Sequence, residues 1–216
     1  MSFTIREADY VNNRIQDVAR ELTNGNLVPV VGAGISAAPP AGLPLWRDFR
    51  DRLLSGLDKQ NHNTGDHHLN FASTLYKIKP ESVLEAVLES TGETGVFSLL
   101  EALHGQDPNP NHELLAQLCR DRFVRIVITT NFDCLLESAL ELRDFTSEPF
   151  PLWDKPDLST TNTFFVAATE EEWAHPALLR VIEERTGPLL LLKLHGTLGH
   201  SNAPARGIVA TLKKAA

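Results

Sequence analysis

The sequence predicts an α/β fold in which helices cover both faces of a parallel sheet. Apolar runs rich in valine, isoleucine or leucine lie at residues 27–31, 124–129 and 189–194, and long segments with helical periodicity separate them. Strands buried on both faces have this nearly continuous apolar character, and parallel neighbours require long crossover connections. The alternation of strands and helices therefore favours a parallel sheet over an all-helical or all-strand fold.

The remaining elements follow from periodicity and from turn residues. A further short strand is expected at residues 164–167. Helices are expected where apolar residues recur every three or four positions: 5–22, 46–57, several short stretches over 69–103, 112–119, 134–142 and 170–186. Connections are expected where glycine, proline and polar residues gather: 32–44, 58–68, 105–111 and 145–157.

Composition excludes several classes of function. The chain has 216 residues, and its 28 acidic and 20 basic side chains give a net charge of −8, which argues against nucleic-acid binding through phosphates. Its two cysteines, Cys119 and Cys134, do not form a Cys-x-x-Cys pair and are expected to be reduced thiols. No apolar run approaches the roughly 20 residues of a membrane span, and Arg6, Glu7 and Asp9 interrupt any signal peptide. We therefore expect a cytoplasmic protein without a membrane partner.

Polar motifs follow each of the three strong strands. The motif GAGIS runs from Gly32 to Ser36, TTNFD ends in Asn131, Phe132 and Asp133, and LHG contains His195. In open α/β sheets, ligands bind beyond the carboxyl ends of the strands. Motifs that are far apart in the sequence can therefore converge on one crevice.

Each motif also has a purely structural explanation. Gly32 and Gly34 can cradle an anionic group with backbone N–H groups, but two glycines after a strand can equally form a simple turn. Asn131 can hold a water or a sugar hydroxyl and Asp133 can accept from an amide, whereas both can simply cap the next helix. His195 can be a general acid or base, or a structural histidine.

Taken together, the motifs resemble those of the sirtuin (Sir2) family. GAGIS resembles the family's phosphate loop, and Gly-Leu-Pro-Leu-Trp-Arg, which ends at Arg47, resembles Gly-Ile-Pro-Asp-Phe-Arg. Pro-Asn-His-Glu-Leu-Leu from Pro110 resembles a helix start of the family with shortened spacing. Thr-Asn-Phe-Asp from Thr130 resembles Gln-Asn-Ile-Asp, and Leu-His-Gly around His195 is the same in both. The motifs occur in the family's order from about residue 27 to residue 211.

The resemblance implies a Rossmann-like NAD-binding domain over residues 1–216, with a helical insertion at about 46–120. It also implies roles for individual residues. Asn131 and His195 would be catalytic, with Asn131 holding the nicotinamide ribose or the attacking water. NAD would bind at Gly32, Ala33, Gly34, Ser36, Arg47, Thr130 and Asp133.

Departures from the family pattern narrow the expected activity. Protein deacylases of this family carry a zinc module with paired cysteines, which this sequence lacks, so neither zinc nor another metal is expected. The sequence most resembles the Sir2-like domains of bacterial antiphage systems. These domains act as effectors that hydrolyse NAD to nicotinamide and ADP-ribose and so deplete NAD. The family continues after residue 211 with an adenosine-binding strand, so we expect a truncated form or a completing partner. A fused effector or sensor and a homo-oligomer are further expectations.

Two other functions stay open: an NAD- or ADP-ribose-binding regulatory module without catalysis, and an NAD-dependent protein deacylase. Two further groups of residues have a functional alternative to their structural one. His62, His67 and His68 can join a metal site with Asp66, although a solvated loop is expected. Aromatic residues at Trp153, Phe164 and Phe165 can stack on adenine, although core packing is expected for them.

Overall fold

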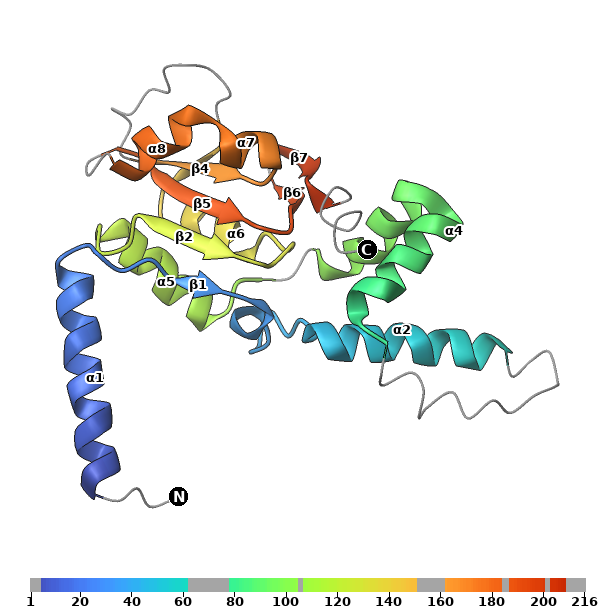
Figure 1. Cartoon of the computed structure of the whole chain (residues 1–216), viewed down its shortest axis with the longest axis horizontal. Helices are drawn as coiled ribbons and strands as arrows, with labels where there is room; N and C mark the ends of the chain where they lie inside the picture. Colours follow the sequence, from blue (N-terminus) through green and yellow to red (C-terminus); the bar gives the residue numbers. More distant parts are fainter. Residues whose placement is uncertain are drawn as a thin grey trace.

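The chain has an α/β fold built on a five-stranded parallel sheet (Figure 1). The computed structural model describes residues 5–61, 78–104, 107–150, 162–183, 187–200 and 203–208. The sheet has the order β1-β2-β5-β4-β3, and β6 and β7 form a separate antiparallel pair. The strands are β1 (Val30–Val31), β2 (Ile126–Thr129), β3 (Thr146–Pro149), β4 (Thr163–Ala167), β5 (Leu189–Lys193), β6 (Thr197–His200) and β7 (Ala203–Arg206). This parallel architecture is consistent with a Rossmann-like fold.

The three strands that precede the polar motifs are neighbours in the sheet. β2 lies between β1 and β5, with Val31 opposite Thr129 and Thr129 opposite Lys193. All three strands run in the same direction, so their carboxyl ends lie side by side at one edge. The chain segments that follow them therefore meet at this edge, as the sequence predicts.

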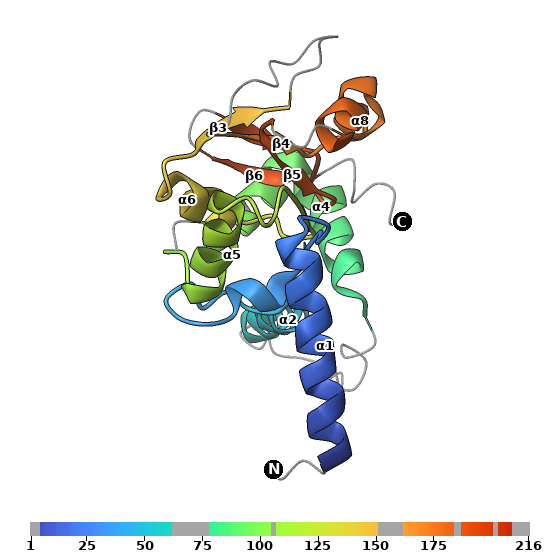
Figure 2. The same cartoon turned by 90° about the vertical axis from the view of Figure 1, so that its left-hand side faces the viewer.

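Helices cover both faces of the sheet and extend beyond it. They are α1 (Ile5–Thr23), η1 (Ala33–Ser36), α2 (Trp46–Asn61), α4 (Pro80–Leu100), η3 (Glu101–Leu103), α5 (Pro110–Arg120), α6 (Leu135–Glu141), α7 (Glu170–Ala174) and α8 (Pro176–Glu183). Figure 2 shows α5 and α6 on one side of the strands and α8 on the other. No helix among the described residues is both long enough and apolar enough to cross a membrane.

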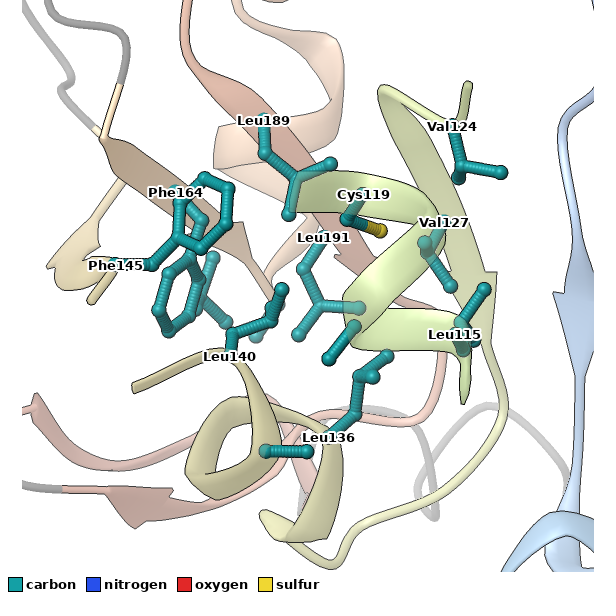
Figure 3. Packing of buried hydrophobic residues seen from close by; sticks show 14 residues of the cluster. Leu115, Cys119, Val124, Val127, Leu136, Leu140, Phe145, Phe164, Leu189 and Leu191 are labelled. Atoms are coloured by element: carbon teal, nitrogen blue, oxygen red, sulfur yellow. The ribbon is translucent and has the colours of Figure 1, made fainter. Parts of the chain in front are cut away.

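The two faces of the sheet have separate apolar cores, because successive strand residues point to opposite faces. On β5, Leu189 and Leu191 pack with the residues of α5 and α6 (Figure 3). Leu190 packs with α8 on the other face. On β4, Phe164 joins the first of these cores and Phe165 the second. Both phenylalanines are buried, so the core-packing alternative is correct for them.

A further apolar cluster lies beyond the carboxyl edge of the sheet. It joins α2 and α4 to the β6–β7 pair through residues that include Phe49, Leu84, Val96 and Leu198. Phe132, from the segment after β2, belongs to the same cluster. Apolar contacts with this cluster therefore hold the segment after β2 in place on its side away from the sheet.

The structure corrects several sequence predictions. The strand expected at residues 27–31 is only Val30–Val31, and it lies at the sheet edge with Val30 exposed, so it is not a buried strand. The helix expected at 170–186 is two helices, because Pro176 cannot continue the hydrogen-bonding pattern of α7. Part of the region expected to form short helices is the long α4, which is kinked at Gly92. β3 forms within the expected connection at 145–157.

Candidate functional site

A cavity of about 240 Å³ opens at the carboxyl ends of β1, β2 and β5. Its lining combines polar residues from the three motifs with apolar residues from the segments around α2 and η3. The lining residues are Ala33, Ser36, Leu43, Pro44, Trp46, Leu103, Thr130, Asn131, Phe132, Asp133 and His195. The three polar motifs thus converge on one cavity, as their positions after neighbouring strands predict.

Most of the residues selected from the sequence line this cavity, but not all. Ala33, Ser36, Thr130, Asn131, Asp133 and His195 are among the lining residues. Gly32, Gly34 and Arg47 are not, and Arg47 is exposed in the first turn of α2. The residues that line the cavity therefore include both expected catalytic residues but only some of the expected NAD-binding residues.

The hydroxyl of Ser36 is the centre of a buried hydrogen-bond network. Ser36 Oγ donates to Asp133 Oδ2 over 3.0 Å and accepts from Asn131 Nδ2 over 3.0 Å. Its third partner is His112 Nε2, at 3.1 Å. All four residues are buried, with Ser36 and His112 at 1% exposure. The network connects the segment after β1 with the segment after β2 and with α5.

The start of α5 determines the direction of the hydrogen bonds. The backbone N–H of Asn109 donates to His112 Nδ1 over 3.2 Å, so this nitrogen carries no proton. The proton of the neutral ring therefore lies on Nε2, which donates to Ser36 Oγ. Burial lowers the pKa of His112 below its usual value, more than the carboxylates of Asp133 and Glu137 raise it. The neutral form that this arrangement requires is therefore favoured.

Two consequences follow for Ser36 and Asn131. A serine hydroxyl has one proton and two lone pairs, and the three partners use all of them. Because His112 donates to Ser36, it cannot act as a base that activates this hydroxyl. Asn131 must point its NH₂ group at Ser36, and its amide oxygen has no hydrogen-bond partner among the residues that the structure describes. That oxygen is available to a ligand in the cavity.

The capping alternatives have different outcomes for the two residues after β2. Asp133 supports the start of α6 but is not its N-cap residue, which is Cys134: its Oδ1 accepts from the N–H of Leu135 over 3.2 Å, while its other oxygen accepts from Ser36. The side chain of Asn131 makes no hydrogen bond with α6 in the described part of the chain, so capping does not explain it. Asp133 therefore combines a structural and a site role, and Asn131 belongs to the site alone.

His195 lies on the cavity wall beside an aromatic group. It is exposed, and within the described ranges its imidazole has no hydrogen-bond partner that would mark it as a structural histidine. Its ring centre lies 6.0 Å from that of Phe132, which in turn lies 5.7 Å from that of Trp46. The imidazole thus faces a cavity with an apolar wall on one side and the amide of Asn131 on another.

The two glycines of GAGIS have different surroundings. A Cβ atom on Gly32 would lie 3.1 Å from Thr130 Oγ1, so the close approach of β1 and β2 favours glycine there. A Cβ atom on Gly34 would meet no protein atom within 4 Å, and Gly34 has no positive φ. No contact in the described part of the protein therefore requires glycine at position 34.

A buried ion pair lies beneath the site and was not selected from the sequence. Lys193, the last residue of β5, is fully buried, and its Nζ lies 2.6 Å from Glu137 Oε1. The sequence signal was the single charge that ends the run Leu-Leu-Leu-Leu-Lys. His112 was also not selected, although it stands in the motif that begins at Pro110, where Asn109 and His112 form a capping box.

The remaining candidates give no second site. Burial raises the pKa of Cys119 and of Cys134 to about 12, so both are protonated thiols. Several candidates lie outside the described residues: His62, Asp66, His67, His68 and Trp153. Residues 209–216, to which the expected truncation refers, lie outside them too. Within the described residues, no group of three or more His, Cys, Asp or Glu side chains is arranged to hold a metal ion.

The comparisons with known proteins do not assign the site. The sequence matches none of the protein-family models and none of the curated proteins with which it was compared.

Proposed function

We propose that the protein hydrolyses NAD to nicotinamide and ADP-ribose. The observation that carries this proposal is the presence of Asn131 and His195 in one cavity, where neither the amide oxygen of the first nor the imidazole of the second has a hydrogen-bond partner among the described residues. A site that breaks the bond between ribose and nicotinamide must orient a water and accept its proton. These two side chains have the chemistry for both tasks.

The reaction needs no protonated leaving group. The bond between C1′ of the ribose and the pyridinium nitrogen breaks, and its electron pair leaves with nicotinamide as a neutral molecule. The oxygen of water adds to C1′, and the water proton goes to a base. We assign orientation of the water or of a ribose hydroxyl to Asn131 Oδ1, and acceptance of the proton to His195.

The shape and composition of the cavity support binding of the nicotinamide end. Its volume of about 240 Å³ lies just below the usual range of roughly 300–1,000 Å³ for ligand pockets, which suits a ring and its ribose better than a whole dinucleotide. Trp46 and Phe132 offer an apolar wall for the ring. In this proposal the carboxylate of Asp133 and the hydroxyl of Thr130 contact the carboxamide and ribose.

The backbone after β1 is the proposed phosphate contact. Gly32, Ala33 and Gly34 form the entry of η1, and the first N–H groups of a helix have no partner within that helix. Without a Cβ atom at Gly34, a phosphate can approach this backbone closely. Arg47, exposed at the start of α2, is proposed to contribute from outside the cavity.

The biological setting belongs to the same proposal and rests on the resemblance to Sir2-like domains. It comprises a zinc-free Rossmann-like domain with an inserted helical subdomain, acting in the cytoplasm as an effector of antiphage defence by NAD depletion. Homo-oligomerisation and a protein partner or fused sensor are part of this setting. Three partners within the protein use the whole hydrogen-bonding capacity of the Ser36 hydroxyl. This arrangement would also suit a regulatory module that binds NAD or ADP-ribose without cleaving it.

One experiment separates these functions. The protein is incubated with NAD, and free nicotinamide and ADP-ribose are measured with and without an acetyl-lysine peptide. Equal release of both products without the peptide supports hydrolysis. Release only with the peptide identifies a deacylase, and binding in a calorimeter without release identifies a regulatory module. Absence of both release and binding contradicts the proposal.

A further inference from the structure

The ammonium group of Lys193 contacts three oxygen atoms inside the protein and, at 4.0 Å, the Sγ atom of Cys134. Nζ lies 2.6 Å from Glu137 Oε1, 2.6 Å from the carbonyl oxygen of Asp133 and 3.5 Å from that of Phe132. An ammonium group has three protons, so the three oxygen acceptors are enough to use its donor capacity. Lys193 and Glu137 have 0% and 2% of their side-chain surface exposed, so solvent takes no part in these contacts.

Both members of this pair are charged, but the pair does not obviously stabilise the folded state. Burial alone lowers the pKa of Lys193, but the carboxylates of Glu137 and, to a smaller extent, Asp133 raise it above its usual value. The lysine is therefore protonated. A buried ion pair has a large desolvation cost, and well-packed apolar residues in its place are often neutral or stabilising. A role in positioning the chain segments that it joins is therefore worth testing for this pair.

Lys193 and its partners lie in the two parts of the chain that carry the proposed catalytic residues: Lys193 precedes His195, and its partners follow Asn131. Lys193 ends β5 two positions before His195, and the carbonyl groups that it binds belong to the two residues after Asn131. The carbonyl of Phe132 also accepts from the N–H of Leu198, from the segment that follows His195. The ammonium group thus joins the end of β5 directly to the segment after β2.

We propose that Lys193 and Glu137 are positioning residues that set the spacing between Asn131 and His195 across the cavity. Lys193 fixes the peptide groups of Phe132 and Asp133 against the end of β5, and Glu137 holds the ammonium group in place from the first turn of α6. The role of this spacing in catalysis rests on the proposed NAD hydrolysis. The positioning itself does not, because it concerns contacts within the protein.

The test uses a double variant in which no charge is left unpaired, Lys193→Met with Glu137→Leu. The matched control is Arg50→Met, which removes another buried cation that donates to a backbone carbonyl, that of Ile78, and that pairs with the partly exposed Asp51; Arg50 does not line the cavity. The first readout is the NMR signal of the Asn131 side-chain NH₂ group, which reports its bond to Ser36 without any ligand. The second readout is steady-state NAD hydrolysis, and the third is thermal unfolding.

We expect the double variant to fold, with shifted Asn131 NH₂ signals, while Arg50→Met keeps the parent signals. If the parent hydrolyses NAD, kcat of the double variant should fall at least about tenfold with KM changed less than about threefold, because spacing acts on the transition state. An unfolded double variant, unshifted Asn131 signals, or turnover equal to that of an active parent would each overturn the proposal. Shifted signals with an inactive parent would support the positioning and refute only the NAD hydrolysis.

Discussion

Ser36 Oγ and His112 Nε2 lie 3.1 Å apart in the interior, although 76 positions separate the two residues in the sequence. The contact joins η1, which follows β1, to α5, which precedes β2. Asn109 supports it from the start of α5, because its side-chain amide donates to the carbonyls of Ile35 and Ala38 over 2.8 and 2.9 Å. The direction of this one bond determines which atoms of the site face the cavity.

The first prediction concerns pH. Burial lowers the pKa of His112 in the folded state below the unfolded value near 6.5, so between these two values the unfolded chain binds more protons at this residue. Its contribution to stability is therefore complete above pH 6.5 and is lost as the pH falls towards the folded pKa. We expect the free energy of unfolding to decrease over that range, measured by denaturant titration at a series of pH values.

To isolate the contribution of His112 from that of the rest of the chain, the comparison is with His112→Gln. The variant should show a weaker pH dependence than the parent, and an NMR titration of the parent should place the His112 pKa below 6.5. A His112 pKa above 6.5 would contradict both the neutral ring and the assigned direction of its bond to Ser36.

The second prediction is that Asn131→Ala removes NAD cleavage and leaves the fold intact. The side chain of Asn131 makes no bond to α6 among the described residues, so no helix cap is lost, and the broken buried bond to Ser36 Oγ should cost about 1–3 kcal/mol without unfolding the protein. Nicotinamide release and the thermal midpoint are measured together, with the exposed Asn111→Ala as control. Cleavage at the parent rate would remove Asn131 from the mechanism.

The third prediction separates stability from binding at Gly34. Apart from its chain neighbours, the described residues place no atom within 4 Å of an alanine Cβ there, and φ is not positive, so the substitution should stabilise the fold by up to about 1 kcal/mol through the unfolded state. If phosphates approach this backbone, the same methyl group should weaken NAD binding. Calorimetric titration measures the second effect. Unchanged affinity in Gly34→Ala would show that the GAGIS segment is only a turn.

The order of elements could be predicted because apolar periodicity records which faces are buried. The runs before Thr130 and Leu194 were confirmed as β2 and β5, and their neighbouring positions in the sheet confirmed that their motifs converge. The strand at 27–31 was overestimated because Val28 and Val30 have the composition of a buried strand, although the edge position leaves both exposed. Edge and centre positions depend on pairing between distant strands, which composition does not record.

The site could be predicted only in part, because some of its contacts also join distant parts of the chain. Asn131 and His195 could be found because each follows a strong strand. The role of His112 depends on its contact with Ser36, and that of Lys193 on its contact with Glu137, and both pairs join distant parts of the chain. Neither contact leaves a pattern in the sequence around its residues. Trp46 and Phe132 likewise become a cavity wall only when α2 packs against the segment after β2.

The fourth prediction concerns the stability of the buried ion pair. Lys193→Met leaves the Glu137 carboxylate buried without its partner and should reduce the free energy of unfolding by about 3–5 kcal/mol. Glu137→Leu should have a comparable effect, whereas the double variant should recover most of the loss, since the two effects are not additive. Denaturant unfolding measures all three. Arg120→Met, which breaks an exposed ion pair with Asp144, serves as the control and should cost less than about 1 kcal/mol. Additive losses in the double variant would contradict this coupling.

The last prediction assigns His195 to the chemical step rather than to binding. Its exposed imidazole makes no hydrogen bond within the described ranges, so His195→Ala should leave stability unchanged. As the base that accepts the water proton, it acts on the transition state, so kcat for NAD hydrolysis should fall by roughly 100-fold or more while the NAD dissociation constant stays within about tenfold. The control is His175→Ala, because His175 packs against Phe150 and does not line the cavity. Stopped assays of nicotinamide release give the first quantity and calorimetric titration gives the second. Loss of binding equal to the loss of turnover would make His195 a binding residue, and undiminished turnover would remove it from the mechanism.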